Sequence, residues 1–117
     1  AGNVEEFTNN FIRFFDLSIP FRKKRTNWVM SIEVGEHVSH EHEAMAISNL
    51  HEHNCQGIIL SWARLAQAGS DHINNHSDKY LINLFGELGY ILDRSLTNTI
   101  RTLSSFGSRT YLAHNAL

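Results

Sequence analysis

Two short apolar runs stand out in the hydrophobic pattern of the chain. They span residues 28–34 and residues 57–63. Both are nearly continuous in apolar character and rich in β-branched residues, which is typical of strands buried on both faces in a parallel sheet. A third run, residues 11–16, ends in Asp16 and is followed closely by the single proline, Pro20. We interpret it as another strand, which leaves the sheet at this carboxylate.

The segment between the two main runs has helical periodicity. Apolar residues recur at intervals of three, at Ala44, Ile47 and Leu50, and the polar positions of 41–53 are mainly His and Glu. One apolar stripe beside a polar face predicts an amphipathic helix. We expect this helix to cross over between two parallel strands.

The remainder of the chain continues to alternate between helices and strands. Ser77 predicts the start of a helix and Gly89 its end, because Ser caps helix N-termini and Gly adopts the left-handed conformation that ends many helices. A strand from Tyr90 is expected next. It is followed by a helix over 95–105 and by a last, shortened strand over 110–117.

Alternating strands and helices predict an α/β fold with helices on both faces of the sheet. Ligands bind such sheets at the carboxyl ends of the strands. A length of 117 residues fits one domain. We therefore expect residues 1–117 to form a single unit with one ligand-binding edge.

Composition and charge narrow the function classes only slightly. Hydrophobic residues make up 42% of the chain, and no apolar run approaches the roughly 20 residues of a membrane span. We expect no membrane partner and a cytoplasmic location. The net charge of -2 argues against a nucleic-acid face that depends on net charge alone. The basic run 22–25 falls in an expected loop, where we expect its side chains to be exposed to solvent rather than in contact with a phosphate.

The most specific local feature is the sequence E-V-G-E-H at residues 33–37. Glu33, Glu36 and His37 are spaced i, i+3, i+4, so a helical turn there would point all three side chains toward one another. Two carboxylates and one imidazole suit Mg²⁺ or Mn²⁺ better than a soft-ligand metal. His72 lies in the loop after the next strand, at the same sheet edge, and is the candidate fourth ligand.

The same residues allow two other roles. Glu33 and Glu36 could cap or hydrogen-bond the loops, with His37 as an ordinary polar residue. Alternatively, His37 could act as a general base that deprotonates an attacking hydroxyl, because the pKa of an unperturbed imidazole lies near neutrality. Metal binding and base catalysis would compete for this one imidazole.

A zinc site built from the other histidines is a weaker hypothesis. His40, His42, His51 and His53 form H-x-H pairs, but two residues at that spacing diverge by about 200° around a helix. We expect them to form a solvated helix face. Cys55 is the only cysteine, which excludes an internal disulfide and a multi-cysteine zinc site. Without an evident activating base, it is expected to be a buried or half-buried apolar group.

The two tryptophans are expected to differ in role. Trp28 begins a strand and is predicted to pack against the sheet. Trp62 directly follows the second main run, where it would overlook the ligand edge. Stacking on a ligand and packing in the core are both open for Trp62.

These features resemble class I S-adenosylmethionine-dependent methyltransferases, whose fourth strand commonly ends in an E-V-x-E-H pattern. The resemblance covers Asp16, residues 28–37 and residues 57–74. It implies a Rossmann-like methyltransferase sheet, from about strand three to the start of strand seven. Asp16 then matches the acidic position that contacts the adenine amine, and Leu17 would lie beside the adenine ring.

The resemblance also implies the reacting end of the site. Residues Glu33 and Val34 would border the methionine end of S-adenosylmethionine. Metal-dependent members, among them small-RNA 3′-terminal 2′-O-methyltransferases and ubiquinone-pathway O-methyltransferases, use an E-x-x-E-H pattern as metal ligands. Glu33, Glu36 and His37 match that pattern. The implied function is methyl transfer to a hydroxyl or other small nucleophile, on a small-molecule substrate or an RNA end.

Two elements of the family pattern are missing from the sequence. There is no G-x-G-x-G turn and no acidic end of a second strand. We therefore expect an incomplete sheet without its first strands, which would bind the cofactor poorly by itself. An open sheet edge favours association. A non-catalytic methyltransferase-like interaction module that forms a homodimer is the alternative function.

Overall fold

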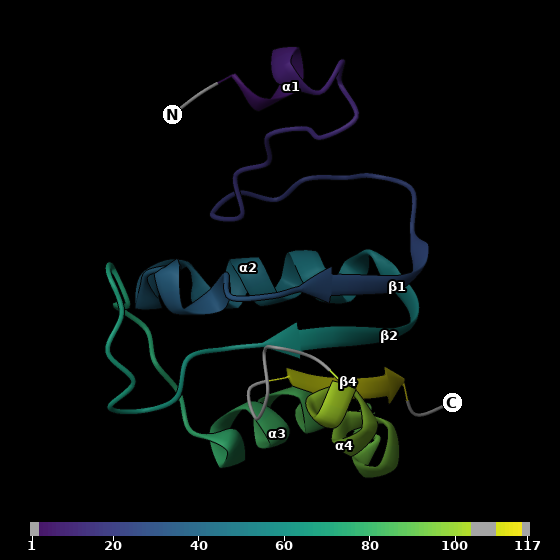
Figure 1. Cartoon of the computed structure of the whole chain (residues 1–117). Coiled ribbons are helices and arrows are strands. Elements are labelled where there is room, and N and C mark those ends of the chain that lie inside the picture. Colours follow the sequence, from purple (N-terminus) through teal and green to yellow (C-terminus); the bar gives the residue numbers. More distant parts are fainter. Residues whose placement is uncertain (1–2, 104–109, 116–117) are drawn as a thin grey trace.

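The computed structural model describes residues 3–103 and 110–115. It contains four helices, one 3-10 turn and four strands in this part of the chain (Figure 1). In chain order they are α1 (Val4–Phe7), β1 (Thr26–Ser31), the turn η1 (Gly35–His37), α2 (His40–Glu52), β2 (Asn54–Ser61), α3 (Asp78–Glu87), β3 (Tyr90–Leu92), α4 (Arg94–Leu103) and β4 (Thr110–Asn115).

The described strands form one mixed sheet in the order β1-β2-β4-β3. β1 and β2 are parallel, with Met30 opposite Ile59. β4 runs antiparallel to both β2 and β3. The predicted parallel pairing of the two main apolar runs is therefore confirmed, and a single antiparallel strand is inserted beside them.

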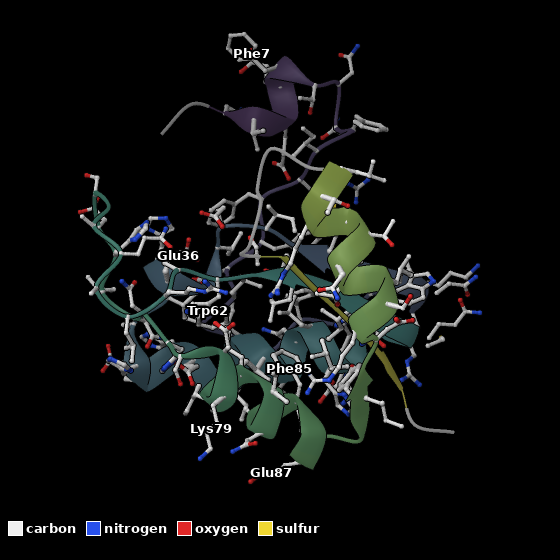
Figure 2. All side chains as sticks on the ribbon, turned by 60° about the horizontal axis from the view of Figure 1, so that its bottom comes forward. Phe7, Glu36, Trp62, Lys79, Phe85 and Glu87 are labelled. Carbon is white, nitrogen blue, oxygen red and sulfur yellow. The ribbon has the colours of Figure 1, made fainter. Side chains whose placement is uncertain are left out.

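Helices cover both faces of this sheet, as predicted. Figures 1 and 2 together place α2 and α3 on one face and α4 on the other. The hydrophobic core lies under α2 and α3, where Ile58 and Leu60 of β2 pack with Ile47 of α2 and with Leu81 and Phe85 of α3. The core includes Trp62, directly after β2, so it reaches the carboxyl ends of β1 and β2 at one edge of the sheet.

The crossover helix is confirmed, but its buried face is rotated from the expected one. α2 buries Glu43, Ala46 and Ile47, whereas Ala44 is exposed. The stripe spaced at threes drifts around a helix of 3.6 residues per turn, so only part of it can face the sheet. A carboxylate thus enters the buried face of α2.

The ends of α3 follow the predicted capping chemistry. The side chain of Ser77 accepts a hydrogen bond from the backbone N–H of Tyr80. Gly89 has a φ of +88°, which favours glycine, and Tyr90 begins β3 directly after it. α4 and β4 also agree with prediction, while residues 104, 105, 116 and 117 of those predicted elements lie outside the described residues.

The strand predicted for residues 11–16 is wrong. This segment is irregular, and the side chains of Phe11 and Phe14 are 90% and 74% exposed. It lies apart from the sheet in Figure 1. A strand needs a neighbour for its backbone hydrogen bonds, and no described strand runs beside this segment. Its apolar run therefore has no sheet to bury against.

Two further expectations need correction. β1 ends at Ser31 rather than residue 34, because Glu33 adopts a positive φ of 54° that turns the chain out of the strand. Cys55 is exposed in β2, not buried; the buried positions of that strand are Asn54, Gly57, Ile58, Leu60 and Ser61. Trp28 is half-buried on β1, in line with its predicted packing role. Across the described ranges, the helices all fall short of the length and apolar character of a membrane span.

Candidate functional site

Two loops meet at the carboxyl ends of β1 and β2, where α/β sheets bind ligands. The loop after β1 contains η1, and the loop after β2 spans residues 62–77. The backbone N–H groups of Ile73 and Asn74 both donate to the carbonyl of Glu36 at 3.0 Å. These bonds fasten the second loop onto the first and fix the side chains that follow.

Trp62 anchors this junction as a core residue. Its ring lies against Gly35, where a Cβ atom would come within 2.2 Å of the indole, so only glycine fits at that position. Its Nε1–H donates to the carbonyl of Asn74 at 2.6 Å, and the residue is only 2% exposed. The ring therefore has no free face for ligand stacking, and the packing role is the correct one.

Glu36 is the most unusual residue at the site. It is completely buried, and Figure 2 labels it at the same end of the molecule as Trp62. Neither of its carboxyl oxygens has a hydrogen-bond partner among the described residues. Nε2 of His72 lies 4.0 Å from its Oε1, and Nδ1 of His72 is also buried and has no partner in the described part of the chain. Buried polar groups in proteins are nearly always paired, so buried polar atoms without partners in the described structure are typical of a ligand-binding site.

His37 completes this group at its exposed side. Its Nδ1 lies 3.0 Å from the carbonyl oxygen of Asp71, and a carbonyl can only accept, so Nδ1 carries the hydrogen. In the neutral ring, the lone pair is then on Nε2. Ligand atoms of Glu36, His37 and His72 all lie within 4.8 Å of one another. The structure therefore brings together three of the four predicted metal ligands.

Glu33 is oriented differently from the other three. Its backbone N–H donates to Ser61 Oγ, and Ser61 Oγ–H donates to its carboxylate, both at 2.8 Å. These bonds tie the end of β1 to the end of β2. Val34, the next residue, is 36% exposed at the same edge. Glu33 thus links the two strands, and it stands beside the group of Glu36, His37 and His72, which we call the three-residue group.

Asp16 and Leu17, predicted for the adenine side, lie in the irregular N-terminal segment. The backbone N–H and the hydroxyl of Ser18 both donate to Asp16, which lowers the pKa of its carboxyl. The carbonyl of Leu17 accepts from the side chain of Asn49 on α2 at 3.1 Å. The segment is therefore held against α2, and the adenine contacts stay a prediction.

A second cluster, around Glu43, was missed by sequence reasoning. Glu43 is 7% exposed and accepts hydrogen bonds from Asn74, His76 and Tyr80. Burial alone would raise the pKa of Glu43, but these three bonds outweigh it and lower the pKa. The bond to Glu43 is the main cause that raises the pKa of Tyr80 to about 12. His40 lies at the exposed side of this cluster.

One sequence signal could have pointed to the second cluster. Glu43 precedes the apolar pair Ala46 and Ile47 by three and four positions, so it shares their helix face. A carboxylate on a buried face requires partners. Those partners, Asn74 and His76 in the loop before α3 and Tyr80 in α3 itself, are more than 30 residues away, so no local pattern identifies them.

Comparison with known proteins gives one structural likeness. No protein-family model matches the sequence, and no curated protein matches it. The crystal structure of magnesium protoporphyrin IX methyltransferase from Synechocystis PCC 6803 with bound SAH is similar, with a TM-score of 0.61 and 18% sequence identity. The match covers 86% of this chain and 49% of that one, so the chain spans about half the length of the solved protein. The α/β fold predicted for the chain, a Rossmann-like sheet of the kind seen in that methyltransferase, is thereby confirmed.

Proposed function

We propose that this chain takes part in S-adenosylmethionine-dependent methyl transfer. The observation that carries the proposal is the buried carboxyl group of Glu36, which has no hydrogen-bond partner among the described residues. His37 and His72 lie beside it, at the carboxyl edge of a methyltransferase-type sheet. The similar solved protein carries bound SAH, the demethylated form of the same cofactor, which supports S-adenosylmethionine as the methyl donor. We assign the reacting end of the site to this edge.

The chain supplies one side of a cofactor site. Glu33 and Val34 are the candidates for its methionine end, and Val34 is exposed at the correct edge for that role. Asp16 and Leu17 are the candidates for its adenine end. The sequence contains no G-x-G-x-G turn, so tight binding would need residues from a further part of the domain. When bound, S-adenosylmethionine supplies the electrophilic methyl group.

His37 is the candidate catalytic base. The hydrogen bond from Nδ1 to the carbonyl of Asp71 orients the ring and leaves Nε2 to take a proton from an attacking hydroxyl. The remaining contribution would be positioning, since methyl transfer gains chiefly from holding nucleophile and methyl group in line. We propose a hydroxyl or other small nucleophile as acceptor, on a small molecule or an RNA end.

The same group fits a divalent cation. With Glu33 outside the group, Glu36, His37 and His72 offer one carboxylate and two imidazoles, a mixed donor set that suits Mn²⁺ and suits Mg²⁺ less well than the predicted two carboxylates. A cation there would stabilise the deprotonated form of the acceptor hydroxyl. Glu33 is not grouped with these three among the described residues, and its carboxylate accepts a hydrogen bond from Ser61. In this version His37 is a ligand rather than the base.

The test is calorimetric titration of S-adenosylmethionine, with and without Mn²⁺, into this chain and into the longest natural form of the protein that contains it. We expect binding by the longer form and weak binding by the chain alone. Absence of binding by both would overturn the proposal. In the longer form, His37→Gln should lower methyl transfer by roughly 10²–10⁴-fold, and His42→Gln is the matched control. Retained Mn²⁺ binding by His37→Gln would identify His37 as the base.

The alternative is a non-catalytic module that forms a homodimer through the edge of β1. In the described sheet, β1 pairs only with β2, and Met30 on β1 is 71% exposed. Unpaired strand edges favour association. Size-exclusion chromatography with light scattering distinguishes the two functions, because a stable dimer without cofactor binding favours the module.

A further inference from the structure

The first turn of α2 and the loop before α3 bring a second set of ligand-type side chains together. Ligand atoms of His40, Glu43 and His76 all lie within 4.8 Å of one another. His40 and Glu43 are three residues apart, so they project from the same helix face. The rings of His40 and His76 are 5.9 Å apart at an angle of 73°. Two imidazoles and a carboxylate therefore converge on one small volume.

Two of the three groups are already held in place. Tyr80 donates to one oxygen of Glu43, and Asn74 donates to the other at 2.6 Å. Nε2 of His76 lies 2.6 Å from that second oxygen, and the ring of His76 stacks on Tyr80 at 3.9 Å. Hydrogen bonds to a ligating carboxylate fix its orientation and raise metal affinity. His40 is exposed, which leaves a path for an ion from solvent.

We propose that His40, Glu43 and His76 form a Zn²⁺-binding site. Two imidazoles with one carboxylate are a zinc donor set, whereas Mg²⁺ and Ca²⁺ prefer sites made of oxygen. The ion would take the place of the hydrogen between Nε2 of His76 and Glu43: in the neutral ring the tautomer changes so that Nδ1 carries the hydrogen, and from a protonated ring the Nε2 proton leaves to solvent. Tyr80 and Asn74 would keep their bonds to the carboxylate. Water would complete the four-coordinate shell. A bound ion would link α2 to the loop between β2 and α3, which also contains His72.

This site is separate from the group around Glu36. The two groups use different carboxylates, and Glu43 is fully hydrogen-bonded, whereas both Glu36 oxygens are unpaired in the described structure. The loop between β2 and α3 contributes one histidine to each, His72 to the first and His76 to the second. The Zn²⁺ proposal therefore does not depend on the methyltransferase proposal.

The experiment is a chelator-competition titration with Zn²⁺ alone, carried out in a Glu36→Gln background that removes the carboxylate of the first group. We expect one bound Zn²⁺. Adding His40→Ala should weaken its affinity at least ~10-fold, and because His40 is exposed the fold should be retained, as checked by circular dichroism. His42→Ala, on the neighbouring position of the same helix, is the matched control and should bind as before.

His76→Ala supplies the second test, since it removes a ligand from the opposite element. Replacing Zn²⁺ by Co²⁺ should give the visible absorption bands of a tetrahedral site in the Glu36→Gln protein, and these bands should disappear when either His76→Ala or His40→Ala is added. Absence of Zn²⁺ binding in the Glu36→Gln protein would overturn the proposal. Equal affinity in His40→Ala and His42→Ala would overturn it too.

Discussion

Glu36 and His72 face each other across a gap of 4.0 Å, inside the protein and without hydrogen bonds to the carboxyl oxygens from the described residues. The other buried carboxylate–histidine pair, Glu43 and His76, is in direct contact at 2.6 Å and has further donors. Both histidines lie in the loop between β2 and α3, whereas Glu36 is in η1 and Glu43 in α2, and in the described structure only the second pair has all its hydrogen bonds made. We therefore interpret the pair of Glu36 and His72 as part of a ligand-binding site.

The substitution Glu36→Gln tests this difference. It keeps the volume of the side chain and breaks no hydrogen bond of the described structure, so we expect the unfolding free energy in EDTA to change by less than about 1 kcal/mol. Mn²⁺ should stabilise the unmodified protein against urea and should not stabilise the variant, because a ligand that binds only the folded state adds to stability.

Glu33→Gln is the control for this experiment. Its carboxylate accepts from Ser61, so the variant should lose stability in EDTA by about 1 kcal/mol but keep the response to Mn²⁺. Equal stabilisation of Glu36→Gln and the unmodified protein by Mn²⁺ would rule out a cation at Glu36.

The bond between Tyr80 and Glu43 predicts a pH dependence at both ends of the scale. The pKa of Tyr80 is raised to about 12, so its contribution to stability is complete below pH 10.0 and is lost as pH rises through about 12. The pKa of Glu43 is lowered from 4.5, so its contribution is present above pH 4.5 and is lost as pH falls through the lowered value.

Tyr80→Phe should remove the first effect and weaken the second, because Asn74 and His76 still donate to Glu43. The ultraviolet titration of tyrosinate should lose its component near pH 12, and acid unfolding should begin at higher pH because Glu43 loses a donor. Tyr80 is 40% exposed, so we expect a cost of only about 1 kcal/mol at neutral pH. Tyr90→Phe is the control, and a component near pH 12 that survives in Tyr80→Phe would contradict the assignment.

The hydrogen bonds of Asn49 predict what holds the N-terminal segment against α2. It is 3% exposed, and its amide donates to the carbonyls of Leu17 and Ile19 at 3.1 and 2.9 Å. Asn49→Ala should release this segment and speed trypsin cleavage within the basic run 22–25. Ser48→Ala, one residue earlier and half-buried, should not. Equal cleavage rates in the two variants would show that the segment is held elsewhere.

The sequence patterns predicted the elements whose signals are local. Continuous apolar runs identified β1 and β2, and the cap at Ser77 with the turn at Gly89 identified α3. Residues 11–16 misled the prediction because an apolar run becomes a strand only beside a partner strand, and partners are a property of the tertiary structure. The run is apolar, but no described strand pairs with it.

The candidate site was likewise predictable only where the sequence signals are local. The spacing of Glu36 and His37 and the loop position of His72 were sufficient to group them, and the structure brings them together. Glu33 separated from the group because a positive φ turns it toward Ser61. His76 could not be assigned to Glu43 from spacing, since hydrogen bonds from a distant loop create that contact.

The last prediction concerns the close approach of Gly35 to Trp62. A Cβ atom at Gly35 would lie 2.2 Å from the indole, which is fixed by its bond to the carbonyl of Asn74. Gly35→Ala should therefore force the ring or the η1 turn to move, at a cost of about 1–3 kcal/mol in unfolding free energy.

Gly86→Ala is the matched control for this steric argument. A Cβ at Gly86 would meet nothing within 4 Å, and alanine favours the helix α3, so this variant should be more stable by up to about 1 kcal/mol. Urea unfolding of both variants measures the difference, and near-ultraviolet circular dichroism reports the environment of the indoles. If Gly35→Ala unfolded at the same urea concentration as the unmodified protein, the loop after β1 would have room to move. The three-residue group at Glu36 would then not be held by Trp62.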